Sequence, residues 1–219
     1  HDNVDGSCRK LARALGQAGL LDAAVAPPEG DASAIDSRSV CLARETLAFH
    51  DGLADFAFAM QGLGSGAVAI AGSAEQRSLV PPKVRSGEWL AAFALSEKEA
   101  GSDVAAMACA AREQGNGYRI DGEKTWISNG GIAGQYVVFA RDGERHTAFA
   151  VEGGNPGLLV VQRQESISPH PLALLRFEKC RVGAEAVIGG RGNGMRVALG
   201  TLDIFRPSVG AAALGLARR

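Results

Sequence analysis

Residues 93–103 read F-A-L-S-E-K-E-A-G-S-D, and the character of the sequence changes across this stretch. Before it, apolar residues recur at the spacing of a helix, and after it they alternate. Within it, Ser96 and Glu99 form a capping-box pattern, S-x-x-E. The following Gly101-Ser102-Asp103 turn exposes backbone N–H groups that suit an anion or a polar ring. Helix capping and a turn between two domains would explain the same residues equally well.

The segments before this stretch predict a helical part. The expected helices are one that Gly19 ends and three more at Ser37–His50, Gly52–Ala71 and Ala74–Arg85. Gly52–Ala71 is almost wholly apolar and rich in Gly and Ala, so we expect it to be buried, packed closely on its neighbours, and to leave room for a pocket beside it. The Pro81-Pro82 pair predicts a break in the last helix, because proline lacks the N–H donor and clashes with the preceding turn.

The segments after the stretch predict short strands separated by Gly- and Asn-containing turns. The expected strands are Met107–Glu113, Tyr118–Ser128, Gln135–Arg141, His146–Val151, Leu158–Gln164 and Leu174–Val182. Strands of this length and spacing favour a small antiparallel barrel or sandwich. A glycine-rich loop, Gly189–Gly194, then returns the chain to a helix that starts at Met195. The expected fold class is therefore α+β: an N-terminal helical domain (residues 1–91), a middle antiparallel β-barrel domain (92–192) and the first helix of a truncated C-terminal helical domain (193–219).

Composition narrows the class of protein. Hydrophobic residues make up 46% and charged residues 21% of the 219 residues, with a formal net charge of -1, which is the balance of a soluble globular protein. We expect no nucleic-acid partner and no membrane contact, because no basic run and no stretch of roughly 18 uninterrupted apolar residues is present. The polar N-terminus lacks a signal-peptide core, so a cytoplasmic location is expected. The four histidines and four cysteines lack ligand spacing, and we expect no metal site.

Two further motifs carry chemical information. Residues 123–129 read E-K-T-W-I-S-N, and strand alternation places Lys124, Trp126 and Ser128 on one face. An indole beside a hydroxyl suits stacking on a flat heteroaromatic ring, although a core Trp beside a surface Ser is the simpler interpretation in isolation. Asp203 and Arg206 stand three residues apart on the last helix and so share a face. A surface ion pair is the simpler interpretation of these two.

The order of these pieces along the chain resembles the acyl-CoA dehydrogenase family. Helices are followed by F-A-L-S-E-x-x-A-G-S-D, a β region with K-T-W-I-S-N-G, then R-G-N-G-M and L-D-x-F-R-P. The resemblance covers essentially the whole chain and implies FAD as the cofactor. The implied FAD-binding residues are Phe93, Leu95, Ser96, Gly101, Ser102, Trp126, Ile127 and Ser128. The implied substrate-binding residues, for the CoA thioester, are Ser102, Asp203 and Arg206.

The resemblance also implies the reaction, which is α,β-dehydrogenation of an acyl-CoA thioester. A base removes the α-proton while the β-hydrogen leaves as a hydride to the flavin. The family's base is a glutamate of the C-terminal helical domain, expected beyond Arg219, so the catalytic residue is unknown here. The implied partners are an acyl-CoA substrate, an electron-transfer flavoprotein or similar acceptor, and further subunits in a homodimer, homotetramer or hetero-oligomer. Two alternatives stay open: a half-subunit or non-catalytic flavin/CoA-binding module, and an acyl-CoA oxidase or flavin monooxygenase of the same fold.

The sequence departs from the family pattern at three places. Ser96 and Ser128 stand where the family commonly has Thr, so the hydroxyl is kept but the methyl that restricts its rotamer is lost. Glu97-Lys98-Glu99 stands where Glu-Pro is typical. Loss of that proline is expected to loosen the loop and to add charge beside the flavin.

Overall fold

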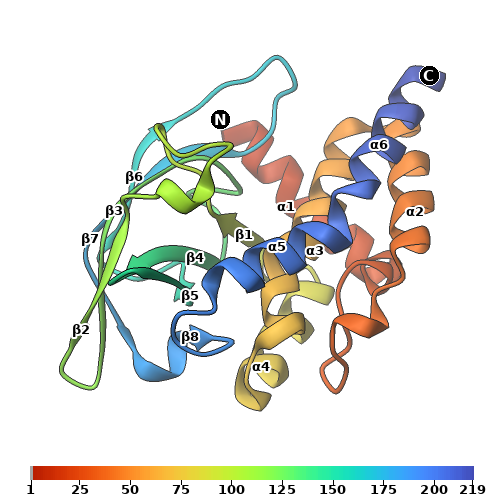
Figure 1. Ribbon diagram of the computed structural model, residues 1–219. Helices are drawn as coiled ribbons and strands as arrows, with labels where there is room; N and C mark the ends of the chain where they lie inside the picture. Colours follow the sequence, from red (N-terminus) through yellow and green to blue (C-terminus); the bar gives the residue numbers. More distant parts are fainter. Residues whose placement is uncertain (1) are drawn as a thin grey trace.

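The computed structural model describes residues 2–219 and confirms the α+β fold class. Figure 1 shows the strands at the left, most helices at the right, and α5 running between them. The helices are α1 (Asp2–Gln17), α2 (Ser37–His50), α3 (Gly52–Ala71), α4 (Ala74–Arg85), α5 (Gly194–Phe205) and α6 (Pro207–Arg218). The strands are β1 (Ala91–Ala94), β2 (Ala110–Gln114), β3 (Gly117–Ser128), β4 (Gln135–Asp142), β5 (Arg145–Glu152), β6 (Leu158–Arg163), β7 (Leu172–Gly183) and β8 (Val187–Ile188).

The helical part follows the predicted boundaries because each helix has a local start or stop signal. Gly19 adopts the left-handed conformation (φ 71°) just after α1, a conformation that glycine adopts without steric cost. The carboxylate of Asp36 accepts hydrogen bonds from two N–H groups at the start of α2, and Asp51 does the same for α3. The predicted break in α4 is wrong, since the helix runs through both prolines. Burial of Val80 and Val84 in the core offsets the backbone hydrogen bonds that the prolines cannot make.

Helix α3 is the core helix of the molecule, and its glycines allow neighbours to approach closely. A Cβ atom at Gly64 would lie 2.6 Å from the Cβ of Ala91 in β1, and one at Gly66 would lie 2.9 Å from the ring of Phe205 in α5. From the sequence, the small residues of this helix were expected to leave room for a pocket. At these two positions there is no such room, because neighbouring elements occupy the space beside the glycines.

Two helical runs, Gly52–Ala71 and Gly194–Arg218, are long and apolar enough to cross a membrane by length and composition alone. The apolar window of the first is 72% buried inside the fold, as in the core helix of a globular protein. The absence of a membrane contact stays a prediction.

The second run was expected to be one continuous helix from Met195 onward. Instead α6 begins at Pro207, because this residue has no N–H group to continue the hydrogen-bond ladder of α5.

The strands form one open sheet in the order β6-β7-β3-β2-β4-β5-β8, so the predicted barrel is present as a sheet that does not close. It is also not purely antiparallel, because β1 pairs in parallel with β4. Strand β1 was not predicted; its residues are mostly buried, so its sequence lacks the alternation of a half-exposed strand. Strand β2 begins at Ala110 and not at Met107, because the N–H groups of Ala108 and Cys109 donate to the Glu97 carboxylate and not to a neighbouring strand.

Candidate active site

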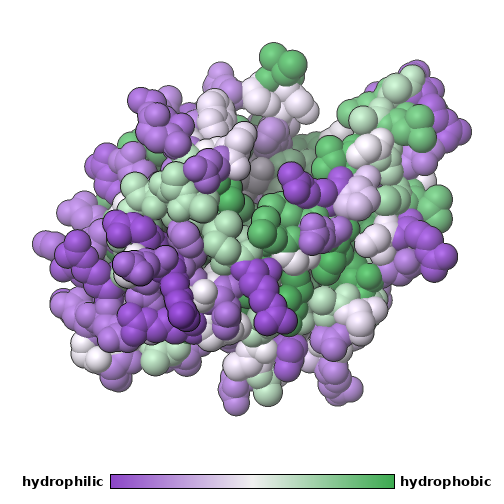
Figure 2. Space-filling view, in the orientation of Figure 1, coloured by the Kyte–Doolittle hydropathy of each residue, from purple (hydrophilic) through white to green (hydrophobic). Residues whose placement is uncertain are grey.

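A cavity of about 630 Å³ lies where the sheet meets α3 and α5. Figure 2 shows apolar side chains gathering between the strand side and the helix side, while the outer surface of the strand side is mostly polar. All eight predicted cofactor-binding residues line this cavity, and so does Arg206. The lining residues are Met60, Leu63, Phe93, Leu95, Ser96, Gly101, Ser102, Val104, Trp126, Ile127, Ser128, Leu199, Leu202 and Arg206.

One wall of the cavity is the segment that leaves β1. Phe93 packs against Phe139 with ring centroids 4.8 Å apart, and Ser96 is half-buried. The Ser96 carbonyl accepts a hydrogen bond from the N–H of Thr125 at 2.9 Å. The predicted capping box is wrong, because no helix begins here. A tight turn closes instead, with hydrogen bonds in both directions between the backbones of Glu97 and Ala100.

The neighbouring part of the lining is a bulge in β3. The register with β7 shifts between Lys124 and Ile127, and Trp126 has a positive φ of 56°. The predicted strict alternation is therefore wrong: Lys124 and Thr125 are both buried, while the Trp126 side chain is 59% exposed at the cavity. A β-bulge places two residues of one strand against one of its partner and turns the following side chains. Ser128, beyond the bulge, returns to the cavity wall.

Gln164 holds this bulge in place. Its Oε1 accepts a hydrogen bond from the N–H of Trp126 at 3.0 Å, and its Nε2 donates to Oγ1 of Thr125 at 3.2 Å. Gln164 follows β6 and lies far from the motif in sequence, so sequence reasoning did not identify it. A backbone N–H that leaves the ladder at a bulge needs another acceptor, but that need does not indicate which residue supplies it.

The charges of the segment 97–99 are arranged differently from the sequence expectation. The carboxylate of Glu97 turns inward and pairs with the ammonium group of Lys124 at 2.8 Å, with side-chain exposures of 9% and 0%. Lys98 and Glu99 are about nine-tenths exposed and lie next to each other at 3.8 Å. None of Glu97, Lys98 and Glu99 lines the cavity, so the expected additional charge is not part of the cavity wall.

Helix α5 supplies the remaining side of the cavity. Leu199, Leu202 and Arg206 line it, whereas Asp203 is exposed and lies outside the lining. No ion pair between Asp203 and Arg206 is formed within residues 2–219. The sequence placed these two residues on one face of a helix, and the structure brings only the arginine to the cavity.

The chemistry of the lining fits a flat polar ring. Trp126 offers an aromatic surface, Ser96 and Ser128 offer hydroxyl groups from two different segments, and the remaining surface is largely aliphatic. The volume lies in the range of small-molecule and cofactor sites, about 300–1,000 Å³. Arg206 is the one charged residue of the lining within residues 2–219, and no carboxylate lines the cavity. The site can therefore bind a ring and an anionic group, but its described lining holds no carboxylate base.

The chain thus has helices before and after a central sheet, with the cavity at their junction. Comparison with known families agrees, since the model of the acyl-CoA dehydrogenase middle domain matches residues 92–180. The chain belongs to the acyl-CoA dehydrogenase family.

Several relatives and solved structures support this assignment. A probable acyl-CoA dehydrogenase of Mycobacterium tuberculosis is 36% identical over 199 residues, which is 88% of this chain and 51% of the relative. The acyl-CoA dehydrogenase of Bacillus anthracis, solved with FAD, is 30% identical with a TM-score of 0.87 over 98% of this chain and 38% of that chain. A chain in a structure of the electron transferring flavoprotein of Acidaminococcus fermentans is 31% identical with a TM-score of 0.89, over 96% and 57% of the two chains. The chain thus spans about half the length of the curated relatives it matches.

Proposed function

We propose that this chain provides the flavin-facing part of a site that dehydrogenates an acyl-CoA thioester between its α- and β-carbons. The observation that carries the proposal is the cavity itself. It unites two motifs, residues 93–102 and 126–128, that are far apart in sequence but that the family resemblance assigns to one cofactor. FAD is the cofactor, as the family and the neighbours solved with FAD or FADH2 support.

The roles of the lining residues follow from their chemistry. Trp126 would stack on one face of the flavin ring, since indole rings favour offset contacts with flat aromatic systems. Ser96 and Ser128 would donate hydrogen bonds to ring heteroatoms from the segment after β1 and from the end of β3. Gly101 and Ser102 would contact both FAD and the thioester arm, and Arg206 would bind an anionic part of CoA. Asp203 stays a predicted CoA contact at the exposed edge of α5.

In this arrangement the cofactor and the protein residues would have different roles in the reaction. Bound FAD supplies the acceptor for the hydride that leaves the β-carbon. The chain's own residues orient the ring and the acyl group and exclude water from the reacting carbons. The base that removes the α-proton is not assigned to any lining residue, because none of them within residues 2–219 carries a carboxylate. We propose an electron-transfer flavoprotein or a similar redox protein as the final acceptor, an assembly of several subunits, and a cytoplasmic location.

The test is anaerobic reduction of the FAD-loaded protein by a panel of saturated acyl-CoA thioesters. The proposal expects loss of the flavin's visible absorbance together with formation of the 2-enoyl-CoA. Ser128→Ala should slow this reduction, whereas Ser78→Ala, an exposed hydroxyl on α4, should leave it unchanged. A protein that binds FAD and CoA but is reduced by no acyl-CoA would lack the base, as expected for a half-subunit or a non-catalytic binding module. Fast turnover with oxygen as acceptor would assign it as an oxidase or a monooxygenase.

A further inference from the structure

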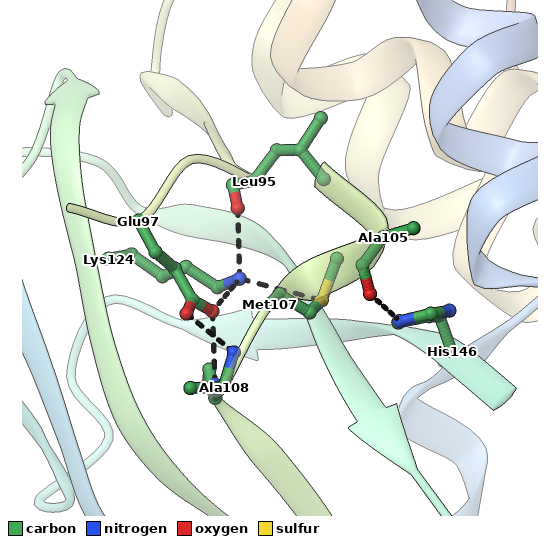
Figure 3. A network of polar contacts seen from close by, with 8 residues as sticks. Leu95, Glu97, Ala105, Met107, Ala108, Lys124 and His146 are labelled. Carbon is green, nitrogen blue, oxygen red and sulfur yellow. Dashed lines mark hydrogen bonds and ion pairs between the residues drawn. The ribbon is translucent and has the colours of Figure 1, made fainter. Parts of the chain in front are cut away.

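A buried ammonium group lies directly behind the cavity wall. Lys124 is fully buried, and its Nζ donates hydrogen bonds to the carbonyl oxygen of Leu95 at 2.9 Å and to Oε1 of Glu97 at 2.8 Å (Figure 3). The same carboxylate accepts hydrogen bonds from the N–H groups of Ala108 at 2.7 Å and Cys109 at 3.0 Å. One ion pair thus joins three segments: the end of β1, the start of β2 and the bulge of β3.

These contacts close the loop of residues 97–108 at its base. The Glu97 carboxylate at one end binds the backbone of the other end, and the ring of His146 lies 3.0 Å from the carbonyl oxygen of Ala105, close to that second end. Gly101, Ser102 and Val104 of this loop line the cavity. These three residues therefore belong to a loop whose base the buried pair closes, although neither Lys124 nor Glu97 lines the cavity.

Lys124 also sets the direction of a backbone donor. A trans peptide is planar, with its C=O and N–H pointing in opposite directions. Since the Leu95 carbonyl points at the buried ammonium group, the N–H of Ser96 in the same peptide unit points away from it. This N–H has no hydrogen-bond acceptor within residues 2–219, and Ser96 lines the cavity. A buried or half-buried N–H without a partner is unusual in a folded protein, which leaves this donor available to a bound ring.

We propose that Lys124 and Glu97 are positioning residues of the flavin site: together they fix the loop 97–108 and turn the Ser96 N–H toward the cofactor. The inference rests on the proposed function for the identity of the ligand. Stability alone does not account for the pair, because apolar residues of similar volume are often as stabilising as a buried ion pair or more so. An apolar side chain in place of Lys124 could not donate the hydrogen bond to the Leu95 carbonyl oxygen.

The experiment compares Lys124→Met with the double variant Glu97→Gln/Lys124→Met. Three quantities are measured on purified folded protein: the thermal midpoint without FAD, the FAD dissociation constant, and the rate at which trypsin cleaves after the exposed Lys98 without FAD. Lys124→Met should lower the midpoint, because it leaves the Glu97 carboxylate buried and unpaired. It should also weaken FAD binding by about tenfold, the scale of one well-directed hydrogen bond, and speed cleavage after Lys98. The double variant should recover the midpoint but keep the weak FAD binding and the fast cleavage.

Arg44→Met is the matched control. Arg44 and Asp55 form a comparably buried pair at 2.8 Å between α2 and α3, outside the cavity lining, so this variant should lose stability without either of the other two effects. If the double variant recovers FAD affinity and slow cleavage together with stability, or if FAD affinity is unchanged in Lys124→Met, the inference is overturned. The cleavage assay needs no FAD. A wild-type protein that binds no FAD would therefore overturn the proposed function, while the cleavage rates would still decide whether the pair fixes the loop.

Discussion

Trp126 offers a test in which two variants should differ in stability but bind the cofactor equally weakly. Its φ of 56° places a bulky residue in the left-handed region, and its side chain is 59% exposed. For an L-residue this conformation costs roughly 1–2 kcal/mol, whereas glycine adopts it freely. Trp126→Ala and Trp126→Gly both remove the indole ring, but only the glycine variant also removes the backbone strain.

Two opposing contributions determine the difference in unfolding free energy between Trp126→Gly and Trp126→Ala. Relief of strain favours the glycine variant by about 1–2 kcal/mol, and the larger entropy of unfolded glycine removes about 0.5–1 kcal/mol of this gain. Trp126→Gly should therefore be more stable than Trp126→Ala by about 0.5–1 kcal/mol. For a chain of this length that corresponds to a thermal midpoint higher by about 1–4 °C. Both variants should bind FAD roughly three- to tenfold more weakly than wild type, because stacking of an aromatic pair contributes about 0.5–1.5 kcal/mol.

The assay is thermal unfolding of the FAD-free proteins, followed by FAD titration of each. Glu123 provides a matched control on the same strand: it is exposed and its φ is not positive. There the glycine variant should be less stable than the alanine variant. Equal midpoints for Trp126→Gly and Trp126→Ala would show that the positive φ is not a feature of the molecule. Unchanged FAD affinity in both would refute the contact between indole and flavin.

Three further predictions concern the scaffold. Asp142→Asn should lower the free energy of unfolding by about 1–3 kcal/mol in chemical unfolding near neutral pH, because the Arg191 guanidinium holds the pKa of this buried carboxyl below its usual 3.8. This contribution stabilises the folded state above pH 3.8, so the difference in unfolding free energy between wild type and variant should narrow as the pH falls below that value. Gly64→Ala should lose about 1–3 kcal/mol to overpacking against β1, whereas Gly200→Ala, whose Cβ would meet Ile70 only at 3.6 Å, should gain about 0.5–1 kcal/mol in the same urea unfolding. A thiol reagent should modify the half-buried Cys41 first in the native protein, since burial raises the pKa of the other three thiols to about 11 or 12. These three buried, neutral thiols stabilise the folded state fully below pH 9.0, the pKa of a thiol in the unfolded chain, and this stabilisation should be lost as the pH rises toward 12.

The helices could be predicted from the sequence because their determinants are local. The periodicity and the caps of α2 and α3 lie within or next to the helices themselves, and the predicted bounds Ser37–His50 and Gly52–Ala71 are those observed. The double proline in α4 misled the prediction, because the tertiary contacts of Val80 and Val84 outweigh a local preference against helix.

The sheet could be predicted strand by strand but not in its pairing. Most strands alternate and are bounded by turns, so β3 to β7 lie close to the predicted ranges. The parallel pairing of β1 with β4 joins residues more than 40 positions apart, and no local pattern records it. The residues Ala91–Ala94 are short and mostly buried, which removes the period-2 signal on which such predictions depend.

The site motifs were located correctly as segments, while the orientation of their side chains depended on a departure from regular geometry. A regular strand through residues 124–128 would place Lys124 and Trp126 on one face, so either a charge would enter the cavity or an indole would enter the core. The bulge resolves this conflict, because it lets Lys124 point inward to Glu97 while Trp126, two residues later, faces the cavity. Local sequence–structure rules are most often broken at functional sites, where the surrounding structure compensates for the strain. Two residues provide this compensation. Gln164 accepts the hydrogen bond from the Trp126 N–H that the bulge releases from the sheet, and Glu97 pairs with Lys124, which the bulge leaves buried. Both compensating residues come from outside β3, and this is the physical reason why the alternation of β3 alone could not predict which side chains face the cavity.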